Sequence, residues 1–241
     1  MLSLIFRVHT AALFVHKCVW LSHSLRSSAP VALCLTNNGL TDDALPPLLL
    51  DKSYSALFLS DNYFALPSAT VLRNHLTPTS HLHTLSLNKN KLSQTFLTTL
   101  VDYLPHGNLR VIGLTECGLK SEPVKVLFKA LVAMEAKGKG LARLFLNCNE
   151  IDDDCGEDIV EFLENSTHLR RLGLASNRFG DRTGDRLTSA VPLCEGLERI
   201  CLAGNEWSNA VRGTLARIGV VNMQRIQGFG KDVKRGSKRK R

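Results

Sequence analysis

Leucines return along this chain in a short, fixed pattern that ends in an asparagine. The clearest copy reads Leu169-x-x-Leu172-x-Leu174-x-x-Asn177, and its neighbours begin 28 residues away on each side, at Leu141 and at Leu197. Side chains two apart lie on one face of a β-strand, so the paired leucines should face a core while the residues beside them face outward. The pattern therefore predicts a short strand, followed by a turn at the asparagine.

Seven copies of this segment align on the residue that closes them. The closing residues are Asn38, Asn62, Asn90, Cys117, Asn149, Asn177 and Asn205. They are separated by 24, 28, 27, 32, 28 and 28 residues, which is the kind of period that solenoid repeats show. A buried amide can satisfy the backbone groups of a turn, and stacked asparagines give every turn the same solution.

Apolar residues at helical spacing fill the stretches between the copies. In the later units they are Phe96, Leu97, Leu100 and Val101; Val124, Leu127, Phe128, Leu131 and Val132; Ile159, Phe162 and Leu163; and Leu187, Ala190, Val191 and Leu193. In the first two units, prolines are expected to break the helical halves. These are Pro46, Pro47, Pro67 and Pro78. Each unit should run strand, turn, helix and return, and bury its apolar face only against its neighbours.

The repeated segment resembles that of leucine-rich repeat proteins, and its period with a helical second half is similar to the ribonuclease-inhibitor-like subfamily. The resemblance covers residues 30 to 210 approximately, and Cys117 is an allowed departure at the asparagine position. It implies an α/β fold of seven repeats: a right-handed solenoid, or horseshoe, with a parallel sheet on the concave side and helices on the convex side.

The first 29 residues stand apart from the repeats. Their apolar residues fall near one helical face, and no acidic residue occurs before Asp42. Residues 1–29 are therefore interpreted either as a capping helix on the first repeat or as a targeting segment that is cleaved off. The apolar stretch between Arg7 and Lys17 is nine residues long, which is too short for a membrane span.

Residues 30–228 should form the repeat domain, and residues 229–241 a basic tail. Val211, Leu215 and Ile218 at helical spacing, followed by an extended edge at Val220 and Val221, indicate a C-terminal cap. The formal net charge is +8, yet residues 231–241 alone hold seven Lys or Arg and one Asp. We expect this tail to be disordered and to serve as a nuclear signal, an RNA contact or a solubilising tail. Its candidate residues are Lys234, Arg235, Lys238, Arg239, Lys240 and Arg241.

Three arginines recur at the same place in successive units. Arg143, Arg171 and Arg199 each precede the paired apolar residues, and strand alternation should place them in one column on the concave face. An acidic peptide or a phosphate could dock there, with Phe145 packing against it and Asn147 as a further contact. The alternative is a solvated face with screened charge. Glu198, beside Arg199, is expected to compensate part of the charge, and small neighbours are expected to leave room for a ligand. The small neighbours are Gly173, Ala175, Cys201 and Ala203.

The sequence offers little that indicates an enzyme. It holds no nucleophile elbow, zinc-protease motif or dinucleotide-binding motif, and neither a metal ion nor a cofactor is predicted. The glycines of segment 136–140 precede a strand and do not make a phosphate-binding loop. Seven cysteines without a C-x-x-C pair favour reduced thiols in an intracellular protein.

The expected function is a non-enzymatic scaffold whose concave face binds a protein partner, acidic in character. Two alternatives stay open at this point. One is a component or assembly factor of an RNA-protein particle, with the tail on RNA. The other is a regulator of a small GTPase, since the Ran GTPase-activating proteins share this repeat subfamily, although they usually carry an acidic segment where this chain has a basic one. We expect a monomer or a subunit of a larger complex in the nucleus or cytoplasm, with the mitochondrion as the alternative location.

Overall fold

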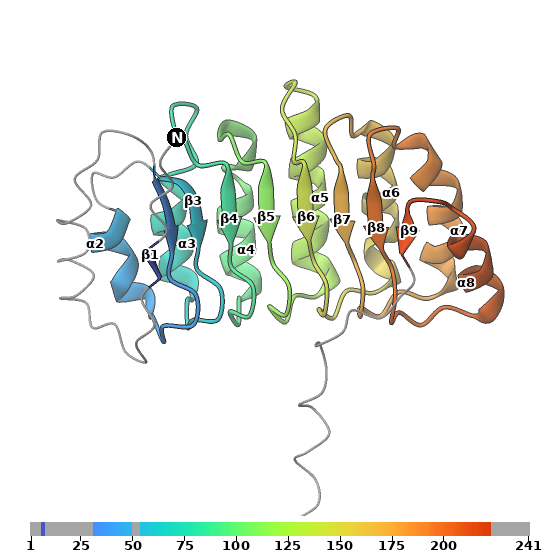
Figure 1. Cartoon of the computed structure of the whole chain (residues 1–241), viewed down its shortest axis with the longest axis horizontal. Helices are drawn as coiled ribbons and strands as arrows, with labels where there is room; N and C mark the ends of the chain where they lie inside the picture. The colour runs from blue at the N-terminus through green and yellow to red at the C-terminus, as the bar shows by residue number, and fades with distance from the viewer. Residues whose placement is uncertain (1–5, 8–30, 50–53, 223–241) are drawn as a thin grey trace, which may run out of the picture.

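A computed structural model describes residues 6–7, 31–49 and 54–222 of the 241-residue chain. Strands and helices alternate along it, and the strands join one sheet in the order of the sequence (Figure 1). Each strand pairs in parallel with the next. The strands are β1 (Phe6–Arg7), β2 (Val31–Cys34), β3 (Tyr54–Phe58), β4 (Thr84–Ser86), β5 (Val111–Gly113), β6 (Arg143–Phe145), β7 (Arg171–Gly173), β8 (Arg199–Cys201) and β9 (Val221–Asn222).

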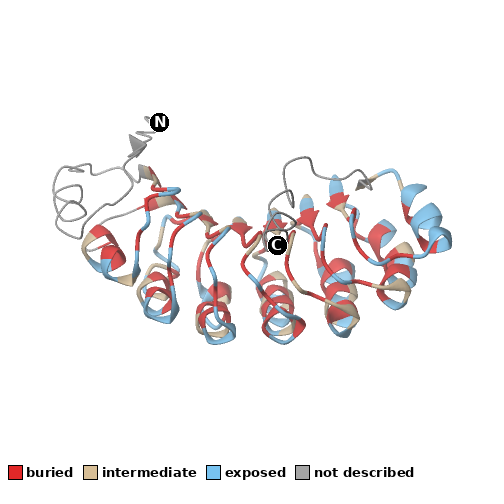
Figure 2. Ribbon diagram, turned by 90° about the horizontal axis from the view of Figure 1, so that it is seen from below, coloured by how far each residue is buried: buried red, intermediate tan, exposed pale blue. Residues whose placement is uncertain are grey.

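The helices cover one side of this sheet. They are α2 (Leu45–Leu49), α3 (Leu66–Arg73), α4 (Gln94–Val101), α5 (Ser121–Glu135), α6 (Gly156–Asn165), α7 (Asp181–Ala190) and α8 (Asn209–Ala216), with short 3-10 turns η1 (Asp42–Ala44), η2 (Leu104–His106), η3 (Asp153–Cys155) and η4 (Val191–Leu193). The stacked units follow a shallow arc with the strands along its inner side and the helices along its outer side (Figure 2). The predicted α/β class and parallel sheet are confirmed, and the repeated strand–helix units are compatible with a solenoid.

One hydrophobic core runs between the sheet and the helices through all the units. The paired strand residues, such as Leu172 and Leu174, are buried, as are most of the predicted helical stripes. Leu193 is an exception, because it lies in the turn η4 after α7 and is 61% exposed. Val191, also in η4, is buried as predicted. The buried stripe therefore continues past the end of α7 as far as Val191 and ends before Leu193.

Prolines begin the first two helices and do not break them, contrary to the sequence prediction. Pro46 and Pro47 lie in the first turn of α2, and Pro67 lies in the first turn of α3. A proline is tolerated there because the first N–H groups of a helix have no partner within the helix. Pro78 lies after the end of α3, outside any helix.

A ladder of buried asparagine side chains joins each unit to the one before it. The Oδ1 atom of Asn177 accepts from the N–H of Ile151 at 3.3 Å. Its Nδ2 donates to the carbonyls of Leu146 and Leu174, both at 3.0 Å. Bonds of the same kind are made by Asn62, Asn90, Asn149 and Asn205. The predicted role of these residues in the turns is therefore confirmed.

Cys117 replaces the asparagine in one unit, and the hydrogen bonds change accordingly. Its thiol donates to the Leu87 carbonyl at 3.3 Å. A thiol offers no amide oxygen, and the N–H of Leu92 bonds instead to the carbonyls of Asn90 and Cys117, at 2.9 and 3.2 Å. Burial raises the pKa of Cys117 to about 12, which keeps the thiol protonated at neutral pH. All six cysteines in the part of the chain that the structure describes are free.

A left-handed backbone conformation precedes every closing residue of the ladder. The φ angle there lies between 56° and 59° in six units and is 77° at Gly204. The six other residues are Asn37, Asp61, Lys89, Glu116, Cys148 and Ser176. Most of these types disfavour this conformation, by about 1 kcal/mol or more each. The turn geometry must therefore be imposed by the ladder and the core, since it does not follow from the residue at the strained position.

The two ends of the sheet carry short strands. At β1 the chain is extended where the sequence pattern predicted helix, and it pairs with the edge of β2, whose backbone groups would otherwise lack partners. The remaining residues of segment 1–29 lie outside the described residues. At the other end α8 and β9 confirm a helix and an extended edge, although Ile218 lies after the end of α8 and Val220 lies in a turn before β9. The strand β9 pairs with β8.

A buried carboxylate holds the loop between α6 and β7 against the preceding unit. Glu135, at the end of α5, is only 4% exposed in its side chain and lies 2.7 Å from Nδ1 of His168. It also accepts from the hydroxyls of Ser166 and Thr167, at 2.8 and 3.1 Å. Burial raises the pKa of Glu135, but these hydrogen bonds outweigh burial and leave the pKa below its ordinary value.

Glu135→Gln should lower the free energy of unfolding at pH 7 by about 1 to 3 kcal/mol, because hydrogen bonds to a charged acceptor are removed. A carboxylate whose pKa is lowered by folding stabilises the protein above its unfolded pKa and loses this effect as the pH falls through the folded value. Urea unfolding at pH 7 and near pH 3 should show a difference between wild type and variant that shrinks in acid. A difference that grows in acid would contradict the assigned charge state.

Candidate functional site

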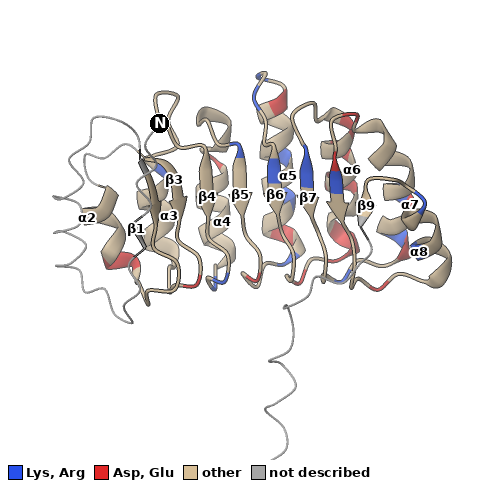
Figure 3. Cartoon of the chain, in the orientation of Figure 1, with Lys and Arg blue, Asp and Glu red and all other residues tan. Residues whose placement is uncertain are grey.

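Three arginine side chains stand in register on the inner face of the sheet. Arg143 pairs with Arg171 and Arg171 with Arg199 across β6, β7 and β8, and all three residues are exposed. Figure 3 shows basic residues on these three adjacent strands. The same position is held by Val111 in β5 and by Thr84 in β4, so the arginines, here called the rungs of the column, are confined to one half of the sheet. The predicted arginine column, Arg143, Arg171 and Arg199, is therefore present.

The column is only weakly compensated by acidic groups. Glu198 lies 3.8 Å from Nε of Arg171, with side chains 58% and 49% exposed, and such surface pairs contribute little. The sequence prediction had matched Glu198 with its neighbour Arg199. That was wrong because the carboxylate of Glu198, which directly precedes β8, reaches back to Arg171 on the neighbouring strand β7. Within the described residues, neither Arg143 nor Arg199 forms a salt bridge.

Asn147 belongs to the framework of the sheet and not to its surface. It is 7% exposed, and its Oδ1 accepts from the N–H of Ala175 at 3.0 Å. A Cβ atom added at Gly173 would lie 2.6 Å from the Nδ2 of Asn147, so glycine is needed for the amide to lie across the neighbouring strand. The prediction of Asn147 as a contact for a partner is therefore not supported by its position.

A second asparagine repeats this arrangement two units earlier. The Oδ1 of Asn88 accepts from the N–H of Thr115 at 2.8 Å, and a Cβ atom on Gly113 would lie 2.8 Å from that oxygen. The sequence contains a signal for this pairing. In each case an asparagine directly follows the leucine pair of one unit, and a glycine ends the strand of the next unit. One of these two bonds joins the ends of β4 and β5, and the other joins the ends of β6 and β7.

Phe145 lies between the two glycines and is half-buried. It pairs with Gly113 on one side and with Gly173 on the other, so its ring has no bulky neighbour at its own level of the sheet. Ala175 and Ala203, expected to leave room for a ligand, are buried. The inner face around the column is therefore shallow, and its accessible groups include the arginines, Glu198 and one aromatic ring.

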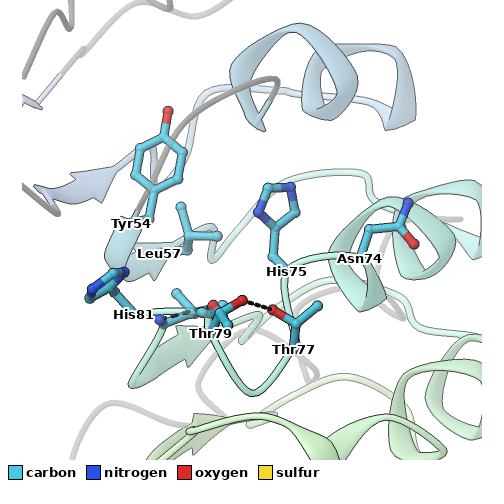
Figure 4. Close-up of a pocket in the computed structure, with 9 residues that line it drawn as sticks. Tyr54, Leu57, Asn74, His75, Thr77, Thr79 and His81 are labelled. Atoms are coloured by element: carbon cyan, nitrogen blue, oxygen red, sulfur yellow. Dashed lines mark hydrogen bonds between the residues drawn. The ribbon is translucent and has the colours of Figure 1, made fainter. Parts of the chain in front are cut away.

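Two hollows of the described surface lie away from the column. One of about 130 Å³ opens at the start of β3, between Tyr54, His75 and the loop that carries Thr77 and Thr79 (Figure 4). The Tyr54 hydroxyl donates to the Leu48 carbonyl at 2.6 Å, and burial raises its pKa to about 12. Burial also lowers the pKa of His75. Tyr54 thus stays protonated at neutral pH, and its hydroxyl is used in a hydrogen bond within the fold.

A wider hollow of about 550 Å³ lies by the loops after β2, β3 and β4. It is lined in part by Asp61, Tyr63, Lys89 and Lys91, and Tyr63 is 73% exposed. In the described part of the chain, no group of three or more His, Cys, Asp or Glu side chains is arranged to hold a metal ion. No helix within the described ranges is long and apolar enough to cross a membrane.

The basic tail, residues 229–241, lies outside the described residues. What the structure places is the strand before it: β9 ends at Asn222, paired with Cys201 of β8. The last described strand therefore lies next to β8, which carries Arg199.

The fold and this site define a class of protein: an α/β repeat protein with a shallow basic face on three adjacent strands of one parallel sheet. The arginine column is its most distinctive surface feature. The sequence matches no model of a known protein family, and no curated protein matches it either.

Proposed function

We propose that this chain is a leucine-rich repeat protein of the ribonuclease-inhibitor-like kind, and that it acts as a non-enzymatic scaffold. Support for the family comes from the seven aligned segments, the asparagine ladder and the strand–helix units along an arc. A stack of such units exposes an extended inner face, which repeat proteins commonly use for binding. The horseshoe of this family would make β2 to β8 the docking side for a partner.

The observation that carries the proposed function is the arginine column. Like charges about 5 Å apart oppose each other by about 1 to 3 kcal/mol, depending on how well water screens them. The three rungs have one weak carboxylate partner among them in the described structure. A ligand with several carboxylates would relieve this repulsion, and the planar fork of arginine binds a carboxylate through two hydrogen bonds. The favoured partner is therefore an acidic segment of another protein.

The test is a quantitative pull-down with a matched control. The Arg143/Arg171/Arg199 triple alanine variant should lose partners that wild type retains. The control is a triple alanine variant of Arg178, Arg182 and Arg186, which are exposed and pair with acids away from the column. It removes the same charge and should retain those partners. Equal losses in both variants would show an effect of net charge and would contradict a site on the inner face.

An RNA-protein particle is the second candidate, and the position of β9 favours it. The strand β9 pairs with β8, and the basic tail follows six residues after Asn222 in the sequence, so the column and the tail could contact one polyanion. Removing residues 229–241 should then weaken binding to single-stranded RNA. It should also flatten the plot of log affinity against log salt by about 0.7 for each phosphate that the tail neutralises. An unchanged slope in a filter-binding titration would rule out this role for the tail.

A further inference from the structure

We infer that the acidic segment bound by the column is an α-helix that lies across β6, β7 and β8. Its carboxylates would be spaced at i, i+4 and i+7, one for each arginine. This inference rests on the proposed function and adds the conformation and the sequence pattern of the ligand. The inference is supported by the spacing of the three arginines, by the residue next to the column and by the shallow shape of the surface.

The spacing of the rungs matches a helix better than an extended peptide. Paired residues of adjacent parallel strands lie about 4.8 Å apart, so the three rungs span about 9.6 Å. On a helix, positions i and i+7 are separated by about 10.5 Å along the axis, and i+4 falls between them on the same face. In an extended chain, three residues on one face span about 13 Å. Only the helix meets all three rungs without stretching.

The residue beside the column adds an apolar position to the pattern. Val111 holds the next rung, one strand before Arg143, and is half-buried. A ligand helix that places a carboxylate on Arg143 reaches Val111 about one turn earlier, at i−3, where a leucine would cover the valine side chain. The expected ligand therefore reads apolar at i−3 and acidic at i, i+4 and i+7.

The shallow surface gives a helix room to approach. The positions two residues further along the strands are Phe145, Gly173 and Cys201, none of which is fully exposed. A helix has a diameter of about 10 to 12 Å with its side chains and cannot enter a narrow cleft, but it can lie on such a face. Phe145 would then contact the flank of the helix, next to the carboxylate on Arg143.

Three labelled peptides of about 20 residues, long enough for partial helicity, test the inference by fluorescence anisotropy against the full chain. The first is rich in alanine and glutamine and carries leucine at i−3 and glutamate at i, i+4 and i+7. The second has the same composition with its glutamates spread around the helix. The third is the first with a proline between the first two glutamates, which breaks the helix.

The first peptide should bind at least tenfold more tightly than the other two, and Arg171→Ala should remove this preference while Arg182→Ala leaves it. Equal binding of all three peptides that still depends on Arg171 would overturn the helix and leave the proposed function standing. No measurable binding of the first peptide would also overturn it. A single-stranded RNA could instead displace the first peptide, bind more tightly than it and depend on Arg171. That result would show that the column binds a nucleic acid and would overturn the helix. The pull-down with the triple alanine variant tests the proposed function separately.

Discussion

Asn177→Leu is expected to lower the free energy of unfolding by about 3 kcal/mol. The substitution removes the acceptor of the Ile151 N–H and the donor to the Leu146 and Leu174 carbonyls. These backbone groups are buried between two units, and each buried group without a partner costs about 1 to 3 kcal/mol before the structure relaxes. Leucine has as many side-chain heavy atoms as asparagine, but its methyl groups are bulkier, so the loss reports the hydrogen bonds together with the cost of fitting these groups. Urea unfolding followed by circular dichroism measures it as a lower midpoint.

Asn165→Leu is the matched control for this measurement. Asn165 is exposed at the end of α6, and its amide bonds only to the Glu161 carbonyl of the same helix. Its substitution should change the free energy of unfolding by less than about 0.5 kcal/mol. If the two leucine variants unfold at the same urea concentration, the ladder does not stabilise the turns in the way described.

Arg171→Glu should weaken binding of the partner by at least about 2 kcal/mol, or thirtyfold in Kd. The central rung would change sign and place a carboxylate between Arg143 and Arg199, which would then pair with it and not with the ligand. The new carboxylate would also lie near Glu198, which now faces Arg171. Isothermal titration calorimetry with the protein recovered in the pull-down measures the change.

The fold should tolerate this charge reversal, because the Arg171 side chain is half exposed and makes one weak ion pair in the described structure. The midpoint of urea unfolding should therefore stay close to that of wild type. Arg182→Glu, on the outer side of the arc, is the control for charge and should leave the affinity unchanged. Wild-type affinity in Arg171→Glu would move the site away from the column, to the loops or the tail.

The repeat unit was predictable from the sequence because its main determinants are local. The alternation of leucines, the period of the asparagines and the strand positions of Arg143, Arg171 and Arg199 all follow from spacing along the chain. The structure confirms each of these placements. What the column binds stays a prediction, since spacing specifies where a side chain points and not what it meets.

The features that the sequence did not reveal depend on contacts between units. Asn147 has the sequence position of a surface residue, but its amide lies across Gly173 of the next strand. Glu198 faces Arg171 across a strand, although Arg199 is its neighbour in sequence. The left-handed residues that directly precede the closing residues are of different types, for example Lys89 and Cys148, so residue type does not predict their conformation. Each of these features needs the register between strands before it can be seen.

The ladder also bears on how such a chain can change in length over evolution. Each asparagine of the ladder bonds its own unit to the one before it, and the strands of the sheet follow the order of the sequence. Deleting residues 149–176 would join Cys148 to Asn177, which reproduces the junction found between Cys148 and Asn149. A deletion one residue shorter would leave an extra residue between the strand and the asparagine that closes its turn, and would disturb the bonds of that asparagine. Duplication or deletion of whole units should therefore preserve the fold, whereas insertions and deletions of a few residues should preserve it only in the loops.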